Sequence, residues 1–556
     1  MKAKVILPWL LAAISAFLLN LPFPIAGPMP YWRMIFAWIA FVPLLVALLG
    51  CGDESRRHPL RMGALLGYLC GTMWYAVNCS WVYYTVHLYG DLSQALSALI
   101  VLVCAMILGG YFALFGFLLV FLRLRFNRGV ALLAVPFLWV AIDLLAYHFT
   151  SVPWDQLGYS QIDNPGVNWL AGWTGVYGIT FVLMLGNAAL AYTVLNICIP
   201  DQRSLWKSGV LGSCVVVLFV WSRDESNFQA EISKLTATAT LIQPNLDVGA
   251  RQYNSVANIN SISTEGRLTC QPYLRGMPET GLALQPDEPC VQGKTTLIVW
   301  PEAPSPLYDI DPRFRQTASK LTIDTHATAV IGVMGVDVGQ PNPEGRSSYQ
   351  IYNSATVTAP DGTFVGRYDK MHLVPYGEYV PYRDVFSFIN KLTQNVGDLS
   401  RGTMHKVFDT DGHRYGVFIC YESIFADEVR DFAAMGAEVF VNISDDGWYG
   451  DTAAPWQHLN MARMRAIESH RWIIRDTNNG VTAIIDPYGR ITASIPRHQA
   501  GVLTARFGYE RGTTFYTAHG DLFADICAIL SLLLLLWAQP FRFGARARFN
   551  QKSGLL

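Results

Sequence analysis

Three residues that could carry out nucleophilic chemistry each follow a segment with the pattern of a strand. Glu302 comes after the apolar run 297–300, Cys420 ends the run 415–419, and Lys370 follows the second arm of a predicted hairpin. In α/β sheets, reactive groups gather just beyond the carboxyl ends of strands. A Cys thiolate is a nucleophile, a carboxylate can accept its proton, and a Lys ammonium can stabilise an oxyanion. The set suggests acyl transfer through a thioester; the alternative is that Cys420 is a buried, inert thiol.

The segments around these residues have the pattern of an α/β domain. Short apolar runs of strand length alternate with helical stretches at 424–435 and 457–470. Pro360-Asp361-Gly362 is a turn signal between two strand patterns and predicts a hairpin. The predicted strands are residues 235–242, 295–300, 327–336, 352–358, 363–368, 414–419, 437–443, 472–476 and 481–485.

The chain as a whole has the composition of a membrane protein. Of its 556 residues, 52% are hydrophobic and 15% are charged, whereas soluble domains average about 25% charged residues. The net charge of −1 disfavours a nucleic-acid-binding protein. Uncharged stretches of about 20 residues can cross a bilayer as helices. They predict eight transmembrane helices, at about residues 5–25, 31–50, 62–86, 93–122, 129–150, 168–198, 207–222 and 520–540.

The distribution of Lys and Arg predicts the orientation of these crossings, because basic connections stay in the cytoplasm. Both termini are expected in the cytoplasm, with the long segment before the last crossing in the periplasm or its equivalent. We expect a membrane bundle at 1–222, a catalytic domain at 223–519, and a final crossing with a basic tail at 520–556. A cleaved signal peptide is the alternative for the first segment. The basic ends hold Lys2, Lys4, Arg56, Arg57, Arg61, Arg123, Arg125, Arg128, Arg203, Lys207, Arg542, Arg546, Arg548 and Lys552.

Asp143 lies within the fifth predicted crossing, where a carboxyl group is a functional candidate. A helix-packing hydrogen bond is the alternative, and it is the interpretation we favour. The other crossings offer almost no ionisable residues, which disfavours a transporter or channel with an extracytoplasmic domain.

Longer motifs surround the three candidate residues. They read Trp300-Pro301-Glu302, the run 368–381 from Tyr368-Asp369-Lys370 to Pro381, and Ile419-Cys420-Tyr421-Glu422-Ser423. Together these motifs resemble the apolipoprotein N-acyltransferases, the integral-membrane branch of the nitrilase superfamily. The resemblance covers nearly the whole chain, including the layout of seven crossings, an outer domain and one final crossing. It extends to 448–450, 455–458, 461–466, 477–481, Pro153-Trp154 and Gly158-Tyr159-Ser160-Gln161.

The resemblance implies a membrane bundle joined to an α-β-β-α sandwich, in an enzyme of the bacterial inner membrane that completes lipoprotein maturation. Glu302 would deprotonate Cys420, which attacks the sn-1 acyl ester of a phospholipid, and Lys370 would stabilise the oxyanion. The α-amine of an S-diacylglyceryl-cysteine apolipoprotein would then take the acyl chain. The implied partners are the phospholipid donor, the apolipoprotein acceptor and the membrane. We expect a monomer with no cofactor, no metal and no nucleic acid.

Other residues match the family's motifs in supporting positions. Glu378 matches its second glutamate, and a carboxylate there would keep Lys370 charged and aimed; a surface loop acid is the alternative. Tyr421 and Glu422 match residues that shape the site, with a packing aromatic as the alternative for Tyr421. The candidates for lipid contact, with core packing as the alternative, are Trp448, Tyr449, Trp154 and Tyr159.

The chain departs from the family's pattern in two short segments. It reads Asp445-Asp446-Gly447-Trp448-Tyr449 where the family commonly has Asn-Asp-Ala-Trp-Phe, and Arg251-Gln252-Tyr253 where a functional Trp is often found. The first change adds a carboxyl group that could alter loop contacts, and the second leaves acyl-chain contacts there in doubt. His372 and His458 belong to no cluster with metal-ligand spacing.

A third departure is an apparent insertion at about 268–293, which contains Cys270 and Cys290. Of the 10 cysteines, only these two and Cys420 lie in the predicted outer domain. Disulfides persist outside the cytoplasm. We therefore predict a Cys270–Cys290 bridge, worth about 3 kcal/mol in the chain-entropy model; two free thiols in a mobile loop are the alternative.

The nitrilase motifs alone would also fit a membrane-anchored amidase or nitrile hydrolase that uses the same triad with water as the acceptor. The predicted crossings argue against this alternative. A soluble amidase works without a membrane bundle, whereas a bundle is needed to admit a lipid substrate.

Overall fold

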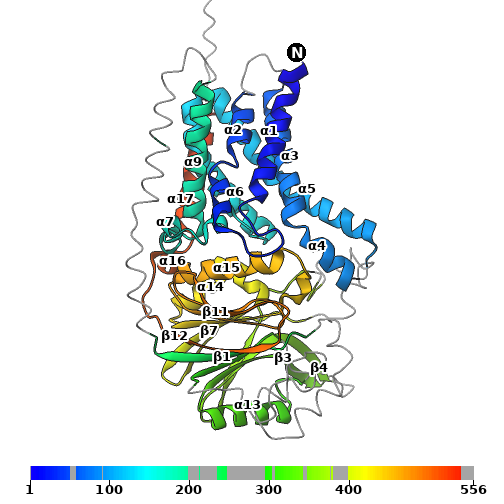
Figure 1. Cartoon of the computed structure of the whole chain (residues 1–556), viewed down its shortest axis with the longest axis vertical. Coiled ribbons are helices and arrows are strands. Elements are labelled where there is room, and N and C mark those ends of the chain that lie inside the picture. Colours follow the sequence, from blue (N-terminus) through cyan, green and yellow to red (C-terminus); the bar gives the residue numbers. More distant parts are fainter. Residues whose placement is uncertain are drawn as a thin grey trace, which may run out of the picture.

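The computed structural model describes residues 2–50, 58–90, 92–197, 212, 235–246, 295–302, 307–341, 347–375, 377–379 and 399–539. The helices of the first 197 residues gather at one end of the molecule and two β-sheets lie at the other (Figure 1). The N-terminus lies at the end of the bundle that faces away from the sheets. The last described helix, α17 (Leu522–Trp537), returns to the bundle and packs against α6.

Four segments of the described chain form helices long and apolar enough to span a membrane: Tyr31–Gly50, Gln94–Arg125, Arg128–Thr150 and Val176–Ile197. Shorter apolar helices cover Ile6–Asn20 and Leu522–Trp537. The eight predicted crossings are therefore supported in part, and the seventh, at 207–222, lies almost entirely outside the described residues. The bundle elements are α1 (Lys2–Asn20), η1 (Tyr31–Trp38), α2 (Val42–Gly50), α3 (Pro59–Asn78), α5 (Gln94–Arg125), α6 (Arg128–Thr150) and α9 (Val176–Ile197).

Two predicted crossings have wrong boundaries. The third was expected to run to residue 86, but α3 ends at Asn78, and the chain continues as α4 (Trp81–Tyr84) and the π-helical turn η2 (Thr85–Tyr89). The sixth was expected from residue 168, but α9 begins at Val176, after the short helices α7 (Pro165–Asn168) and α8 (Ala171–Thr174). In both places the apolar side chains pack against the sheet domain instead of continuing a straight helix.

The other end of the molecule is an α/β sandwich of two six-stranded sheets (Figure 1). The first sheet has the order β12-β1-β2-β3-β4-β5, and the second has the order β11-β10-β9-β8-β7-β6. The strands of the first are β1 (Ala237–Gln243), β2 (Leu297–Trp300), β3 (Thr328–Pro341), β4 (Ser347–Thr358), β5 (Phe364–Asp369) and β12 (Gly501–Phe507). Those of the second are β6 (Val407–Thr410), β7 (His413–Ile419), β8 (Val439–Ser444), β9 (Ile473–Thr477), β10 (Thr482–Ile485) and β11 (Ile491–Ile495).

Each sheet buries one face against the other and is covered by helices on its outer face. Apolar residues of both sheets share one core cluster, which includes Leu241 and Val299 from the first sheet and Val417 and Val441 from the second. Helix α13 (Pro312–Thr325) covers the first sheet on the side away from the bundle. Helices α14 (Ala426–Ala434) and α15 (Ala454–Ser469) cover the second sheet on the side toward the bundle. This is the α-β-β-α arrangement that the family resemblance implied.

The bundle and the sandwich share a continuous buried interface. One apolar cluster contains bundle residues such as Trp154 and Ala171 together with Tyr421, Tyr449 and Met461 of the sandwich. Helix α15 therefore lies between the second sheet and the bundle, and the ends of β7 and β8 are close to the bundle.

Candidate active site

Cys420 occupies a sharp turn where β7 passes into the 3-10 helix η9 (Cys420–Ile424). Its side chain is buried and its φ angle is +50°. Residues other than Gly rarely adopt this left-handed conformation, which costs of order 1–3 kcal/mol and persists only where the surroundings hold it. The turn presents the thiol at the carboxyl end of a central strand, as the sequence predicted.

Glu302, Lys370 and Glu378 meet in one buried ion cluster. The Lys370 ammonium donates to Glu302 Oε1 at 3.2 Å and to Glu378 Oε1 at 2.9 Å. Asn353, on the neighbouring strand β4, donates through Nδ2 to the same two oxygens at 2.6 and 2.7 Å. The second carboxylate oxygens are also held, because Asp445 N–H donates to Glu302 and Val374 N–H donates to Glu378, both at 2.8 Å. The four side chains are thereby fixed in orientation.

The charges of this cluster act on Cys420. Burial raises the pKa of the Cys420 thiol well above its usual range, and Glu302 raises it further while Lys370 lowers it. For Lys370, burial alone would lower the pKa, but Glu302, Glu378 and Cys420 raise it well above the ordinary lysine value. The resting site therefore holds an ammonium group beside a neutral thiol, and a proton must leave the thiol as it attacks.

Glu422 ties two segments of the chain together next to this ion cluster. Its carboxylate accepts hydrogen bonds from Ile419 N at 2.7 Å, Tyr368 Oη at 2.8 Å and Met371 N at 2.6 Å. These donors come from the strand before Cys420 and from the segment around Lys370. Glu422 thus fixes the lysine segment relative to the cysteine turn. Burial raises its pKa to about 7.

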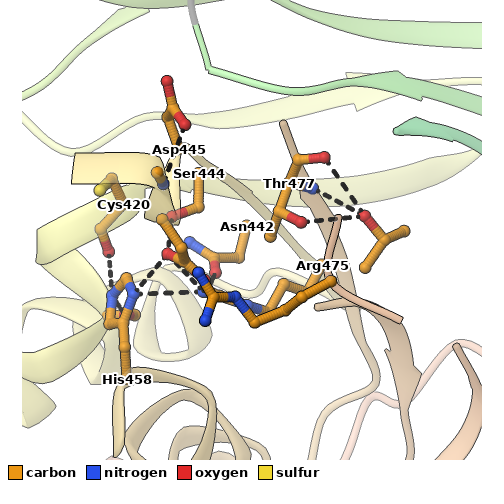
Figure 2. Close-up of polar contacts among 12 residues, drawn as sticks. Cys420, Asn442, Ser444, Asp445, His458, Arg475 and Thr477 are labelled. Atoms are coloured by element: carbon orange, nitrogen blue, oxygen red, sulfur yellow. Dashed lines mark hydrogen bonds and ion pairs between the residues drawn. The ribbon is translucent and has the colours of Figure 1, made fainter. Parts of the chain in front are cut away.

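A second buried ion cluster lies behind the cysteine turn (Figure 2). His458 Nε2 is 3.0 Å from the Cys420 carbonyl oxygen, and His458 Nδ1 is 2.9 Å from Asp446 Oδ1. Arg475 donates through Nη2 to both Asp446 oxygens, at 2.8 and 3.1 Å. The three ionisable side chains are fully buried.

The aromatic residues predicted to contact lipid lie where the sandwich meets the bundle. Tyr449 is buried against Trp81 and Trp154, with ring centroids 5.2 and 5.9 Å away. Trp448 is partly buried beside Tyr89, at 5.1 Å. These contacts are protein contacts, so a role in binding lipid stays a prediction.

Two further aromatic candidates and Tyr421 also connect the two parts of the chain. Trp154 is buried and donates through Nε1 to Gln457 at 2.9 Å, and buried Tyr159 accepts from Arg465 at 2.7 Å. The Tyr421 hydroxyl lies 3.5 Å from the Ser151 carbonyl. All three side chains hold α15 or the cysteine turn against the bundle.

The remaining sequence predictions concern residues outside this site. Asp143, on α6, lines a small cavity with Asp155 and Trp139, and its Oδ2 has no hydrogen-bond partner among the described residues. Within the described ranges, no group of three His, Cys, Asp or Glu side chains could hold a metal ion. The predicted disulfide between Cys270 and Cys290 and the segment 251–253 lie outside the described residues.

Sequence reasoning missed two parts of this site. Asn353 bridges the two glutamates, and nothing in the sequence distinguished it from the other polar residues of its strand, such as Ser354 and Thr356. His458 was considered only as a metal ligand, and its contact with Cys420 joins residues 38 positions apart. The extra carboxyl group at Asp445 accepts from Asn478 Nδ2 at 3.1 Å, so the departure at this position is accommodated by a hydrogen bond.

Comparison with known proteins identifies two family profiles in the chain. The profile described as apolipoprotein N-acyltransferase N-terminal domain matches residues 6–189, and the profile described as carbon-nitrogen hydrolase matches residues 243–513. The apolipoprotein N-acyltransferase of Geobacter metallireducens is 31% identical over 527 residues, which cover 93% of each chain. That of Azotobacter vinelandii is 33% identical over 509 residues, 91% of each chain. Among solved structures, a carbon-nitrogen hydrolase from Helicobacter pylori aligns with 55% of this chain and 96% of its own, at 15% identity and a TM-score of 0.32.

Proposed function

Since this chain belongs to the apolipoprotein N-acyltransferase family, we propose that it moves a fatty acyl chain from a phospholipid to an apolipoprotein through a thioester on Cys420. The donor position is sn-1, and the acceptor is the α-amine of an S-diacylglyceryl cysteine. The observation that supports this mechanism best is the buried Lys370 ammonium, shared by the Glu302 and Glu378 carboxylates and close enough to Cys420 to act on its thiol.

In the first half of the reaction, Glu302 takes the thiol proton as sulfur attacks the ester carbonyl. Lys370 stabilises the negative charge that develops on the carbonyl oxygen. The tetrahedral intermediate then collapses, the C–O bond to the glycerol breaks, and Glu302 returns the proton to the departing lysophospholipid. Glu378 and Asn353 keep the ammonium and the base in place through the contacts described above. No metal or organic cofactor takes part in this scheme.

In the second half, the neutral α-amine of the apolipoprotein attacks the thioester and loses a proton to Glu302. The C–S bond breaks, Glu302 returns the proton to sulfur, and an amide remains on the acceptor. This two-stage scheme predicts ping-pong kinetics. Both lipid substrates must reach the cysteine turn, and its position beside the bundle supports entry from the membrane.

The proposed location is the bacterial inner membrane, with the sandwich in the periplasm and both termini in the cytoplasm. The clustering of basic residues at one set of helix ends supports this orientation. The proposed division of the chain remains 1–222, 223–519 and 520–556, and we propose that the enzyme acts as a monomer.

The mechanism is tested by incubating the purified full-length protein with a phospholipid labelled in its sn-1 chain. The wild type should acquire a hydroxylamine-labile label, and Cys420→Ala should acquire none. Labelling of Cys420→Ala would refute the thioester on this residue.

A second step separates transfer from hydrolysis. A diacylglyceryl peptide with a free amine should discharge the adduct and become labelled, whereas the same peptide with an acetylated amine should not. Discharge by water alone, at a rate that the peptide leaves unchanged, would favour the amidase-like alternative.

A further inference from the structure

The contact between His458 and Cys420 is made to the backbone of the nucleophile. In Figure 2 the Cys420 carbonyl points to the His458 ring and the sulfur points away from it. The Nε2–O distance is 3.0 Å, and the ring is fully buried. A carbonyl oxygen and a carboxylate oxygen can only accept, so the contacts to Cys420 and Asp446 are both hydrogen bonds only when Nε2 and Nδ1 each carry a proton. The Ser423 hydroxyl shares the same ring nitrogen at 2.7 Å.

Fixing that carbonyl fixes the turn. A trans peptide holds its C=O and N–H on opposite sides. Because this peptide is trans, the Tyr421 N–H points away from His458. Cys420 is in the left-handed region at φ +50°, a conformation that the surroundings must maintain. A donor on its carbonyl opposes rotation of this peptide and so holds both the sulfur and the neighbouring N–H in place.

His458 is itself held on one side by a buried ion pair. Asp446 accepts from Arg475 and from the Ser444 hydroxyl, the latter at 2.8 Å. Arg475 also donates to the side-chain oxygen of Asn442. Although burial alone would raise it, Arg475 and His458 hold the pKa of Asp446 well below its usual range. The carboxylate is thus charged and anchored when it meets Nδ1.

On its other side, His458 is held by the membrane bundle. The Trp154 ring stacks on the imidazole with an interplanar angle of 20° and a centroid distance of 6.3 Å. Trp154 donates to Gln457, the residue before His458, and Gln457 donates to the Asn78 side chain at the end of α3, at 3.0 Å. The helix that carries His458 is therefore joined to two bundle segments.

We propose that His458 is a positioning residue that holds the strained turn of Cys420 through its Nε2–H, with the Asp446–Arg475 pair and Trp154 of the bundle fixing the ring. This role rests on the thioester chemistry proposed for Cys420. It makes the membrane bundle part of the support of the nucleophile, in addition to any part in admitting lipid.

The proposal is tested with two substitutions that differ in one property. His458→Gln keeps a side-chain N–H that can reach the Cys420 carbonyl, whereas His458→Phe keeps the ring and its stacking but has no donor. The measurement is the single-turnover rate of thioester formation in the full-length protein at several phospholipid concentrations. It yields a maximal rate and a half-saturating concentration, both normalised to folded protein.

We expect His458→Phe to lower the maximal rate about 10²-fold, the cost of a small misplacement of a reacting group. The half-saturating concentration should stay within about twofold, because the proposed role of His458 is to hold the nucleophile and not to bind the phospholipid. His458→Gln should recover at least about tenfold of the lost rate. The matched control is His413→Ala, which removes a carboxylate-paired imidazole at the start of β7, the strand that ends just before Cys420, and should leave the rate unchanged.

Equal rates for His458→Phe and the wild type would overturn the proposal, as would equal rates for His458→Phe and His458→Gln at normal thermal stability. A change confined to the half-saturating concentration would also overturn it. If His458→Phe does not fold, Asp446→Asn serves as the test variant, because it removes the charge that orients the His458 ring and keeps the side-chain volume. It should slow thioester formation about tenfold, and a wild-type rate would refute the role. Failure of the wild type itself to form a thioester would instead refute the proposed function.

Discussion

Replacing Lys370 by Met should separate the electrostatic role of the ammonium from its packing. Met has a similar length and no charge, and Lys370 is only 1% exposed, so the change leaves the surface unaltered. It does remove the cation between Glu302 and Glu378, which are 6% and 8% exposed. Both carboxylates then keep Asn353 as a shared donor but lose their counter-charge.

The size of the effect follows from this geometry. Two oxygens that share one amide donor lie within about 5 Å of each other, and unit charges at that distance repel by about 3 kcal/mol at an effective dielectric constant of about 20. Breaking a buried ion pair by removing one partner costs about 3–5 kcal/mol. We expect Lys370→Met to lower the free energy of unfolding by about 4 kcal/mol, or the melting temperature by about 10 °C. Thioester formation should fall by at least about 10²–10³-fold, since a charge that stabilises the oxyanion is lost.

The assay is thermal unfolding in detergent at several pH values, together with the single-turnover labelling assay. Adding a proton to either carboxylate would relieve the repulsion in Lys370→Met, so this variant should regain stability as the pH is lowered. Lys320→Met is the control, because the exposed Lys320–Asp324 pair at 2.6 Å should contribute less than about 1 kcal/mol. Adding Glu378→Gln to Lys370→Met should restore most of the stability and none of the activity.

The electrostatic reasoning would be refuted if Lys370→Met melted at the same temperature as Lys320→Met. It would also be refuted if the double variant were less stable than Lys370→Met alone, because the repulsion between the two carboxylates would then be absent.

Three further substitutions test other parts of the structure. Burial raises the pKa of Glu422 from 4.5 to about 7. The free energy of unfolding of the wild type should therefore fall by up to about 3 kcal/mol as the pH rises through this window, and Glu422→Gln should not show this decrease. Although burial alone would raise it, Arg475 holds the pKa of Asp446 well below its usual range. The stabilisation that the Asp446 carboxylate provides should therefore be lost as the pH falls below about 4. Asp446→Asn should be less stable than the wild type at neutral pH, and its stability should fall less steeply in acid. Gly175 has φ +63°, and a Cβ there would lie 2.6 Å from the Tyr516 ring, so Gly175→Ala should cost at least about 1–3 kcal/mol.

Each of these three has a direct check by thermal unfolding. An unchanged pH profile for Glu422→Gln would mean that the carboxyl group does not titrate in that window. If the stability of Asp446→Asn fell as steeply in acid as that of the wild type, the stabilising role of the Asp446–Arg475 ion pair would be contradicted. For the glycine, Gly412→Ala is the control, because Gly412 has φ +73° with no atom near its would-be Cβ. Gly175→Ala should be the more destabilising of the two.

Local sequence patterns were sufficient for much of the sandwich. Predicted strands at 352–358 and 363–368 correspond to β4 and β5, because Pro360-Asp361-Gly362 sets the turn and both strands contain β-branched and aromatic residues. The patterns around β2 and β7 likewise located Glu302 and Cys420 at strand ends. Strand ends and turns depend mainly on residues that are close together in the chain, so they can be predicted from a single sequence.

Among the described strands, the edge strands β6, β11 and β12 were missed, whereas the edge strand β5 was predicted. β11 is mostly exposed, and β12 is half-buried or exposed at every position except Phe507, so neither has an apolar run of the kind that marks a buried strand. β12 is held by pairing with β1, about 260 residues earlier in the chain. Helix α13 was also not predicted, although its sequence contained a helical pattern: Phe314, Ala318 and Leu321 are buried at helical spacing.

The sequence by itself, through its motifs, named Glu302, Lys370, Cys420 and Glu378 and indicated the chemistry they could share. Only the tertiary structure decided how they are supported. Asn353 reaches two glutamates that lie on separate segments, and His458 reaches the backbone of Cys420 from a helix packed against the membrane bundle. Hydrogen bonds depend on distances of about 3 Å between groups far apart in sequence, and those distances exist only after the two sheets, α15 and the bundle have packed together.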